Sequence, residues 1–307
     1  MNEITFGKFD LSKYSDRLVV TDEKIAELHG ISGDNVYLLP SGERAKSFEH
    51  VEALCKWFLS KQLEKGSTVV AVGGGSIGDT VGFATSIYKR GVNVLHVPTT
   101  LIAQVDSSIG GKTAIDVGNV KNAVGTYHFG ETLIDFSFLS TLDDEQFVSG
   151  FGEILKYAML DEHVAVAFND DHRDLTRLIH ACVRCKQFYC DLDPYCKGAR
   201  NKLNFGHTIG HAMELSYDLP HGVAVANGIY YETLLAFKLG KCDKSYADKW
   251  MGEVCEVFKI YPLTKEILNL TLQDKKNAQG KVCFVLPDKF DEAYLAVNEV
   301  EELLLND

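Results

Sequence analysis

The sequence predicts an α/β fold in two parts, a parallel sheet covered by helices and then a mainly α-helical region. Short β-rich runs alternate with helical ones as far as Pro98, which is the pattern of successive βαβ units. From about Ser149 long helical stretches dominate. We therefore expect one domain over residues 1–146 and a second over residues 147–307, with the boundary in the polar run Asp143–Gln146.

The elements of the first domain follow from the spacing of its apolar residues. Val51, Leu54 and Phe58 recur at helical intervals, whereas the run 68–72 is continuously apolar, as in a strand buried on both faces. The expected strands are residues 17–21, 35–39, 68–72 and 92–97, and the expected helices are residues 23–29, 48–61 and 77–88.

The second domain has helical periodicity along most of its length. The expected helices are residues 151–159, 163–168, 175–188, 206–217, 223–239 and 244–258, and one β-like element is expected at 282–286. This domain is therefore predicted to be mainly α-helical.

Composition narrows the class of protein. The chain has 307 residues, 46% of them hydrophobic and 24% charged, as in an ordinary globular enzyme. Its formal net charge of −12 argues against nucleic acid or an anionic membrane as a partner. No apolar run approaches the ~18 residues of a membrane span, and the first residues lack a signal region. The expected location is the cytoplasm.

Eight cysteines are present, and in a chain of this kind reduced thiols are expected rather than disulfides. Cys182, Cys185, Cys190 and Cys196 could form a structural zinc cluster, but they lack a second C-x-x-C pair. Scattered thiols are the competing interpretation.

A glycine-rich turn at residues 73–79 follows the buried strand 68–72 and opens a helix. Glycines at such a turn let backbone N–H groups approach a pyrophosphate at the positive end of the helix dipole. With a strand before it and a helix after it, the turn predicts a Rossmann-like nucleotide-binding domain. Tight packing alone would also account for the glycines.

Three histidines, His207, His211 and His221, lie within fifteen residues, and the first two are one helical turn apart. Glu153 and Lys156 are likewise one turn apart further upstream. A carboxylate with two or three imidazoles is the ligand set of an open, catalytic zinc-type site. The alternatives to a metal site are that the histidines belong to the core and that Glu153 lies on a solvated helix face.

Basic residues offer sites for anionic oxygens. Lys112, Lys121 and Arg90 could converge on a phosphate or a carboxylate, although each alone is more often a solvated residue. Thr99 and Thr100 follow a strand and could bond a ribose or a nicotinamide, or cap a helix.

Together these segments resemble the sugar phosphate cyclase family, in its 3-dehydroquinate synthase branch. The matching motifs run in family order across roughly residues 20–280. They are the turn 73–79, Arg90-Gly91, Pro98–Leu101, Asp106–Thr113, Lys121-Asn122, Glu153–Lys156, Asn204–His211, His221-Gly222 and Asp274–Lys276.

The resemblance implies a lyase of the shikimate pathway that depends on NAD and on a divalent metal, Zn²⁺ or alternatively Co²⁺. Such an enzyme converts 3-deoxy-D-arabino-heptulosonate 7-phosphate, a phosphorylated sugar acid, into 3-dehydroquinate and phosphate. The route is transient oxidation, phosphate elimination, re-reduction and intramolecular aldol closure. Homodimers are common in the family, so a homodimer is expected.

The resemblance also assigns residues. The metal ligands would be Glu153, His207 and His221. The NAD contacts would be Asp22, Glu43, Lys46, Gly74, Gly75, Ser76, Asp79, Thr99, Thr100, Lys121 and the stretch Phe138–Thr141. The substrate contacts would be Arg90, Asp106, Lys112, Asn122, Lys156, Lys186, Arg200, Asn204 and the pair Lys275 and Lys276. His211 would transfer protons, with Lys112, Lys156, Lys186, Arg200 and Asn204 as the other catalytic groups.

Three features depart from the family pattern. Cys196 stands where a glutamate usually precedes the Arg200 position, Val223 replaces a glutamate after His221-Gly222, and the N-terminus is short. Because the ligands, the lysines and His211 are intact, we still expect activity.

Three alternatives compete with this interpretation. A metal-dependent NAD polyol dehydrogenase shares the two-domain plan and the glycine turn, but has no obvious use for Lys112. Another cyclase, such as 2-deoxy-scyllo-inosose synthase, is less consistent with the run Gly110–Thr113. Cys196 and Val223 would suit a non-catalytic NAD-binding homologue.

Overall fold

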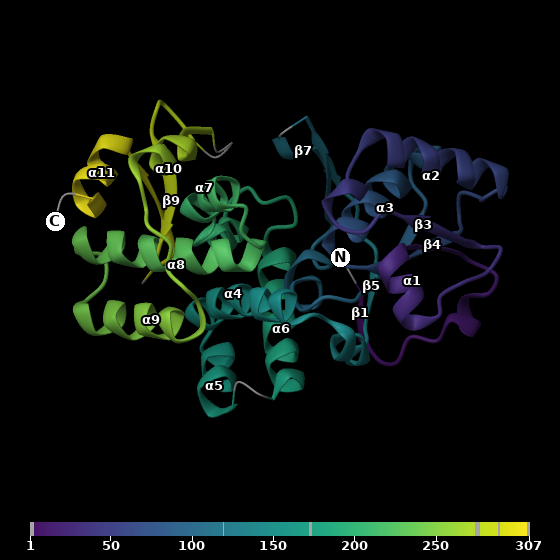
Figure 1. Cartoon of the computed structure of the whole chain (residues 1–307), viewed down its shortest axis with the longest axis horizontal. Coiled ribbons are helices and arrows are strands. Elements are labelled where there is room, and N and C mark those ends of the chain that lie inside the picture. The colour runs from purple at the N-terminus through teal and green to yellow at the C-terminus, as the bar shows by residue number, and fades with distance from the viewer. Residues whose placement is uncertain (1–2, 119, 172–173, 274–276, 288, 306–307) are drawn as a thin grey trace. The chain divides into compact units, whose positions relative to one another are not determined.

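A computed structural model describes residues 3–118, 120–171, 174–273, 277–287 and 289–305. The chain forms two compact units, Met1–Asp143 and Asp144–Asp307, so the break falls within the polar run named above. Figure 1 shows strands concentrated in the first unit and helices in the second.

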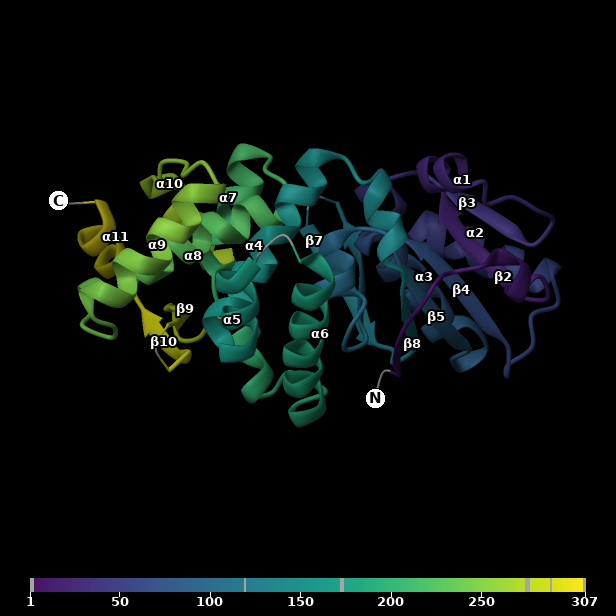
Figure 2. The same ribbon diagram turned by 90° about the horizontal axis from the view of Figure 1, so that it is seen from below.

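The first unit is built on a six-stranded parallel sheet. Its strand order is β1-β8-β5-β4-β2-β3, where the strands are β1 (Ile4–Phe6), β2 (Leu18–Asp22), β3 (Val36–Leu39), β4 (Thr68–Gly73), β5 (Asn93–Pro98) and β8 (Glu131–Ile134). The central strands lie side by side in Figure 2. The predicted parallel α/β architecture is therefore confirmed.

Alternate residues of the central strands point to opposite faces of the sheet and pack in two separate hydrophobic cores. Val69 and Ala71 of β4 pack with residues of α2 (Phe48–Ser60) and α3 (Gly75–Ile87). Val70 and Val72 face the other side, with Phe138 and residues next to α1 (Glu23–His29). Both faces are thus covered, which explains why this strand is continuously apolar.

Sequence periodicity did not reveal every element of this unit. A hairpin of β6 (Lys112–Val117) and β7 (Val120–Tyr127) forms a separate two-stranded antiparallel ribbon. A π-helical turn, Ala103–Ser107, carries Asp106, and a 3-10 turn, Phe136–Thr141, follows β8. These short segments carry several of the residues assigned by resemblance.

The second unit is mainly helical, as predicted. Its helices are α4 (Asp144–Leu160), α5 (Glu162–Asp171), α6 (Leu175–Leu192), α7 (His207–Tyr217), α8 (His221–Lys238), α9 (Lys244–Val257), α10 (Lys265–Leu270) and α11 (Val297–Leu305). Helix α8 packs against α4, α7 and α9. The β-like run at 282–286 is strand β9 (Val282–Leu286), and it pairs with an unforeseen strand, β10 (Asp291–Leu295).

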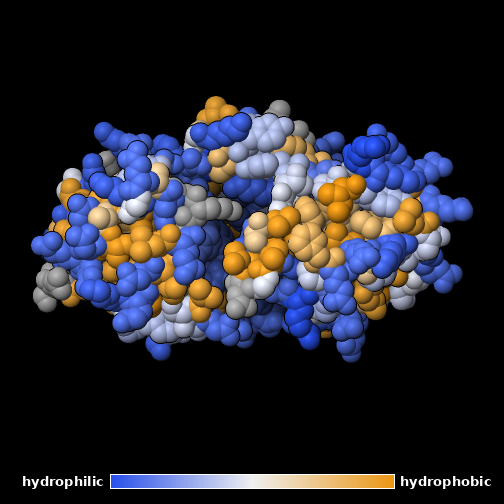
Figure 3. All heavy atoms as spheres, turned by 90° about the horizontal axis from the view of Figure 1, so that it is seen from above, coloured by the Kyte–Doolittle hydropathy of each residue, from blue (hydrophilic) through white to orange (hydrophobic). Residues whose placement is uncertain are grey.

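The described residues form no disulfide among their eight cysteines. None of the helices in those residues is both long and apolar enough to cross a membrane. On the face drawn in Figure 3, hydrophobic side chains are interspersed among hydrophilic ones.

Candidate metal and nucleotide sites

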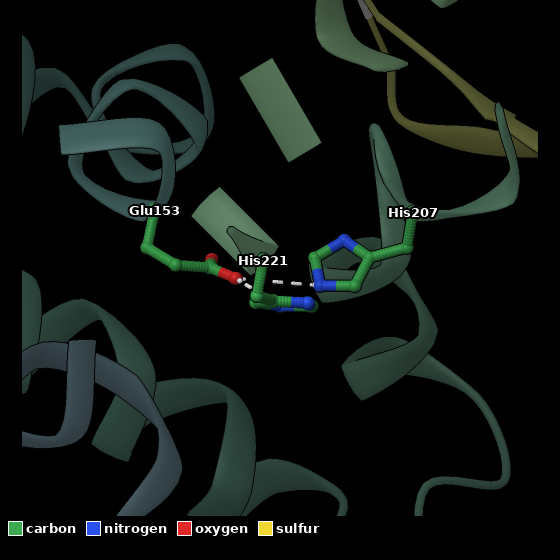
Figure 4. Close-up of side chains that lie close together, drawn as sticks. All are labelled: Glu153, His207 and His221. Carbon is green, nitrogen blue, oxygen red and sulfur yellow. Dashed lines mark ion pairs between the residues drawn. The ribbon is translucent and has the colours of Figure 1, made fainter. Parts of the chain in front are cut away.

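Glu153, His207 and His221 meet at one point in the second unit, each from a different helix (Figure 4). The Glu153 Oε1 atom lies 3.4 Å from His207 Nε2 and 3.3 Å from His221 Nε2. The three ligand atoms lie within 4.8 Å of one another. One carboxylate and two imidazoles leave an open position on a zinc-type cation, which is the composition of a catalytic site.

Glycines beside the ligands bring the helices into backbone contact. A Cβ atom added to Gly152 would lie 1.9 Å from the Gly222 carbonyl oxygen, and one on Gly222 would lie 1.7 Å from the Ser149 oxygen. A Cβ on Gly228 would lie 1.8 Å from the oxygen of Gly206. Helices α4 and α7 therefore approach α8 closely, backbone to backbone, and this places the three candidate ligands together.

The outer nitrogens of both histidines are hydrogen-bonded. His207 Nδ1 lies 3.0 Å from the Phe205 carbonyl oxygen, and His221 Nδ1 lies 2.9 Å from Glu214 Oε2. Both partners accept, so each Nδ1 carries the proton and each Nε2 lone pair is left for a cation. The donor set thus fits a divalent metal without rearrangement.

The charges within this cluster are strongly coupled. Burial favours the neutral form of Glu153, but the charge of Lys156, with smaller effects of the two histidines, outweighs it and holds the pKa of Glu153 well below the ordinary value. Burial likewise opposes protonation of His221, yet its hydrogen bonds with Glu153 and Glu214 raise its pKa to about 10. Glu153 is therefore held in its charged form, which is the form that binds a cation.

His211 lies on the exposed side of this centre, one turn beyond His207. The centre of its ring is 5.3 Å from that of His207 and 5.9 Å from that of His221. His211, Glu214 and His221 also offer ligand atoms within 4.8 Å of one another. This second group shares His221 with the first, and its Glu214 is already hydrogen-bonded to His221 Nδ1. We therefore interpret the two groups as parts of one metal centre, in which Glu214 orients a ligand.

The remaining assigned residues of this unit are mostly buried. Lys156 is 1% exposed and forms an ion pair with Glu153, and Lys186 is 7% exposed on α6. Arg200 is 1% exposed and donates to the Pro194 carbonyl oxygen at 2.9 Å. Asn204 ends the 3-10 turn Ala199–Asn204. Lys275 and Lys276 lie outside the described residues.

The Cys196 departure has a structural counterpart. Cys196 has a φ of +54°, and its Sγ atom lies 3.2 Å from Asn201 Oδ1. The Asn201 amide donates to Glu292 Oε1 at 2.8 Å. A carboxylate thus reaches this loop from β10 instead of from position 196.

In the first unit the glycine turn forms a cradle for phosphate. Strand β4 ends at Gly73 and α3 begins at Gly75, and no side chain caps the helix at Gly74. A Cβ on Gly74 would lie 3.0 Å from Thr100 Cγ2, and one on Gly75 would lie 3.1 Å from Ser107 Oγ. Uncapped N–H groups at a helix start, with little room for side chains beside them, fit a pyrophosphate.

Buried polar atoms around the turn lack hydrogen-bond partners among the described residues. They are His96 Nδ1, Thr99 Oγ1 and Ser107 Oγ. His96 and Ser107 line a cavity with the glycine turn. Such atoms are costly to bury unless a ligand or water completes them, so the donor set agrees with a nucleotide site.

Residues assigned to NAD lie at or follow the carboxyl ends of β2 and β3. Asp22 Oδ1 accepts from the Ile25 amide at 3.0 Å, which caps α1, and from Ser41 Oγ at 2.7 Å. Glu43 Oε2 accepts from Ser76 Oγ at 3.2 Å, across to the glycine turn. These polar groups therefore share one edge of the sheet.

Lys46 connects the nucleotide and substrate assignments. Its Nζ atom donates to Asp79 Oδ2 at 2.8 Å and to Asn122 Oδ1 on β7. Burial raises the pKa of Asp79 to about 6, against the opposing effect of Lys46. Lys46 thereby fixes the β6–β7 hairpin, which also bears Lys112 and Lys121, against α3.

The other assigned residues of this unit are dispersed. Phe138 is 4% exposed and belongs to the core beneath the sheet, where its ring centre lies 4.6 Å from that of His29. Thr141 Oγ1 lies 2.9 Å from His29 Nε2. Arg90, with a φ of +63°, ends the 3-10 turn after α3.

Sequence reasoning missed several supporting carboxylates. Glu214 lies seven residues after His207, which places it on the same helical face, and that spacing could have identified it. Glu232, 0% exposed on α8, accepts three backbone N–H groups at the start of α7. No local pattern indicates that role, because it depends on the packing of two helices.

Comparisons with known proteins agree with this arrangement. Residues 36–149 match a family described as 3-dehydroquinate synthase N-terminal, and residues 150–277 match 3-dehydroquinate synthase C-terminal. The chain is 34% identical to 3-dehydroquinate synthase from Dictyoglomus thermophilum over 310 residues, covering 94% of this chain and 87% of the relative. It is 36% identical to the synthase from Alkaliphilus metalliredigens over 298 residues, covering 88% and 83%.

Solved structures show the same fold. A 2-epi-5-epi-valiolone synthase from Streptomyces hygroscopicus, with NAD⁺ and Zn²⁺ bound, superposes with a TM-score of 0.83 at 24% identity, covering 100% of this chain and 96% of the other. A 2-deoxy-scyllo-inosose synthase complexed with carbaglucose-6-phosphate, NAD⁺ and Co²⁺ gives 0.83 at 22% identity, covering 99% and 96%.

Proposed function

The chain belongs to the 3-dehydroquinate synthase family, and we propose that it converts 3-deoxy-D-arabino-heptulosonate 7-phosphate into 3-dehydroquinate and phosphate. The observation that carries this proposal is the convergence of Glu153, His207 and His221, with His211 one turn away, in a chain that also has an open glycine cradle. A metal centre and a nucleotide cradle in one chain suit a reaction that oxidises and then reduces the same substrate.

The residues present fit both implied groups. Glu153, His207 and His221 would hold the cation, and the turn at Gly74 and Gly75 would hold the NAD pyrophosphate. When bound, the cation would polarise a substrate hydroxyl, and NAD⁺ would reversibly accept a hydride from the carbon that bears that hydroxyl. The catalytic nicotinamide is thus regenerated in each turnover.

His211 is the group that we assign to proton transfer. Its ring lies beside the two ligand histidines, on the exposed side where a substrate would enter. A neutral imidazole nitrogen there can take a proton from the substrate hydroxyl and return it later. Glu214, which is hydrogen-bonded to His221 Nδ1, keeps the His221 ring fixed while that proton moves.

Basic side chains would hold the two anionic ends of the substrate. In the second unit these are Lys156, Lys186 and Arg200, and in the first they are Arg90 and Lys112. Fixed cations orient the substrate so that the C–O bond to phosphate breaks as the neighbouring C–H loses its proton. This elimination makes the enzyme a carbon–oxygen lyase.

The proposal includes the setting of the reaction. The substrate is a small phosphorylated sugar acid, the protein acts in the cytoplasm, and two copies form a homodimer. The absence of disulfides among the described cysteines agrees with a reducing compartment. The net charge of −12 explains why the anionic substrate needs local basic residues.

One assay tests the proposal. Purified protein is incubated with the heptulosonate phosphate, catalytic NAD⁺ and Zn²⁺, and phosphate and dehydroquinate are measured. We expect both products in equal amounts without accumulation of NADH. If no phosphate is released, the proposal is wrong. Stoichiometric NADH formed from a polyol would instead identify a dehydrogenase.

A further inference from the structure

The metal-bearing helix α7 begins against a carboxylate that belongs to another helix. Glu232 of α8 is 0% exposed. Its Oε2 atom accepts from the Gly206 amide at 2.7 Å, and its Oε1 atom accepts from the amides of Thr208 and Ile209 at 3.1 Å each. These amides flank the ligand His207 on both sides, so the carboxylate fixes the backbone from which that ligand projects.

No side chain of α7 itself supplies this cap. The helix starts after Gly206, which has a φ of +78° and forms no side-chain capping bond. The first N–H groups of a helix need acceptors, and a negative charge there also interacts favourably with the helix dipole. Glu232, which is distant in the sequence, therefore supplies the acceptor for these N–H groups that the residues next to the helix start do not supply.

A second carboxylate accepts hydrogen bonds from the backbone of the loop that precedes this helix. Asp193, just after α6, accepts from the amides of Lys197 at 2.9 Å, Gly198 at 2.7 Å and Arg200 at 3.2 Å. Burial works against its charge, but these backbone hydrogen bonds lower the pKa of Asp193. The loop that presents Arg200 is thus built around this one side chain.

We propose that Glu232 and Asp193 are positioning residues: Asp193 holds the backbone of residues 197–200, and Glu232 holds the backbone of residues 206–209. Glu232 sets the place of the metal ligand His207, and Asp193 sets the place of Arg200. The Asp193 half of this inference rests on the proposed function, because it takes Arg200 as a substrate contact. The Glu232 half needs only that the centre binds a cation.

Each carboxylate can be tested by replacing the acidic residue with its amide counterpart. In Glu232→Gln and Asp193→Asn one acceptor oxygen becomes an NH₂ group, which then faces a backbone N–H. In Glu232→Gln a buried donor is left without an acceptor, which is costly, and in Asp193→Asn the loop loses an anchoring hydrogen bond, so the backbone shifts locally in each variant. The two variants change charge in the same way and remove the same kind of bond, which makes each a matched control for the other.

The experiment measures cation affinity and substrate KM separately. Co²⁺ is titrated into the metal-free full-length protein and followed by visible absorption, and KM is measured at saturating cation. We expect Glu232→Gln to weaken Co²⁺ binding about 10- to 100-fold, as changes behind a ligand do, with little change in KM. Asp193→Asn is expected to raise KM and to leave Co²⁺ affinity unchanged.

Three results would overturn the inference. They are wild-type Co²⁺ affinity in Glu232→Gln, a wild-type KM in Asp193→Asn, or a parallel loss of both quantities in both variants. If the wild-type protein binds Co²⁺ but releases no phosphate, the proposed function fails while the Glu232 result stands. Hydrogen exchange of the 197–200 amides then tests Asp193 without turnover, and unchanged exchange in Asp193→Asn would refute its role.

If Glu232→Gln does not fold, a milder variant and a measurement on the wild-type protein test the same role. Glu232→Asp keeps the charge but shortens the reach, and we expect an intermediate Co²⁺ affinity. In the wild-type protein, the amides of Gly206, Thr208 and Ile209 should exchange as slowly as those inside α7. Rapid exchange at these three amides, in a helix that is otherwise protected, would contradict the cap.

Discussion

His207, a proposed metal ligand, is the first residue of α7, and its Nδ1 atom is hydrogen-bonded to the Phe205 carbonyl oxygen. We predict that His207→Ala loses bound metal and activity together. The loss of affinity should exceed the about 10- to 100-fold that changes behind a ligand cause. Metal content after dialysis and phosphate release measure the two effects. A variant that keeps both would refute the ligand assignment.

Cys196 stands where the resemblance to the family led us to expect a glutamate. Its thiol contacts Asn201, which is already bonded to Glu292. We predict that Cys196→Glu loses little activity or gains some, because a new carboxylate there restores the family pattern without a new backbone requirement. The turnover number of this variant tests the prediction, and Cys196→Ser is the control. A large loss confined to the glutamate variant would contradict the prediction, and a large loss in both variants would give the cysteine a role of its own.

His96 makes the stability of the first unit depend on pH. It is 6% exposed, and burial, with a smaller effect of His128, lowers its pKa to about 4. A histidine whose pKa is lower in the folded state stabilises the protein above pH 6.5 and loses that contribution as the pH falls toward 4. Between pH 7 and pH 5 the expected loss is about 2 kcal/mol.

The variant His96→Gln isolates that contribution. Urea unfolding of both proteins at pH 7 and pH 5 gives four stabilities, and other acidic groups cancel in their difference. We expect the wild-type protein to lose more stability than the variant on acidification. If both lose equal amounts, His96 is not the titrating group.

Among the elements, the contact of α4 with α8 depends on Gly152. A methyl group there would lie 1.9 Å from the Gly222 oxygen, which is backbone and cannot turn aside. We predict that Gly152→Ala destabilises the second unit by about 1–3 kcal/mol and weakens metal binding, because Glu153 is the next residue. Thermal unfolding and Co²⁺ titration measure the two losses.

Gly252 provides the matched control. It lies in α9, and apart from its chain neighbours and its own helix backbone no atom of the described residues lies within 4 Å of an added Cβ. Gly252→Ala should therefore stabilise the helix by about 0.5–1 kcal/mol and leave the metal site unchanged. Equal effects of the two substitutions would show that helix propensity, and not the α4–α8 contact, explains the result.

Elements with a strong apolar period were predictable from the sequence, and those defined by long-range contacts were not. Helix α1 has the predicted bounds, Glu23–His29, because Asp22 caps it and Gly30 ends it in the left-handed conformation. Helix α4, in contrast, begins at Asp144, within the polar run that was expected to be a boundary. Acidic residues are favourable in a first helical turn, so this polar run starts a helix.

The same division applies to the site. The ligand spacing and the glycine turn are local patterns, so they were visible in the sequence. Lys46 is different, because its contacts with Asp79 and Asn122 join residues that are far apart in the chain. Glu232 acts across two helices in the same way. Such groups can be identified only once the fold brings them together.

At the scale of the whole chain, two units with separate cores each carry one kind of site. A ligand that binds only the folded state stabilises the part that binds it, by about 2.7 kcal/mol at a concentration of 100 Kd. We therefore predict that Zn²⁺ slows hydrogen exchange in α4, α7 and α8, whereas NAD⁺ slows it in β4 and α3. Removal of the metal with EDTA should reverse only the first effect.

Hydrogen exchange read by mass spectrometry separates these effects, because the affected elements fall in different peptides. His207→Ala serves as the control: Zn²⁺ should no longer protect α7, while NAD⁺ should still protect α3. Protection of both units by either ligand alone would mean that the two sites are energetically coupled. In that case metal loading would promote nucleotide binding, and by thermodynamic reciprocity NAD⁺ would tighten the binding of Zn²⁺ by the same factor.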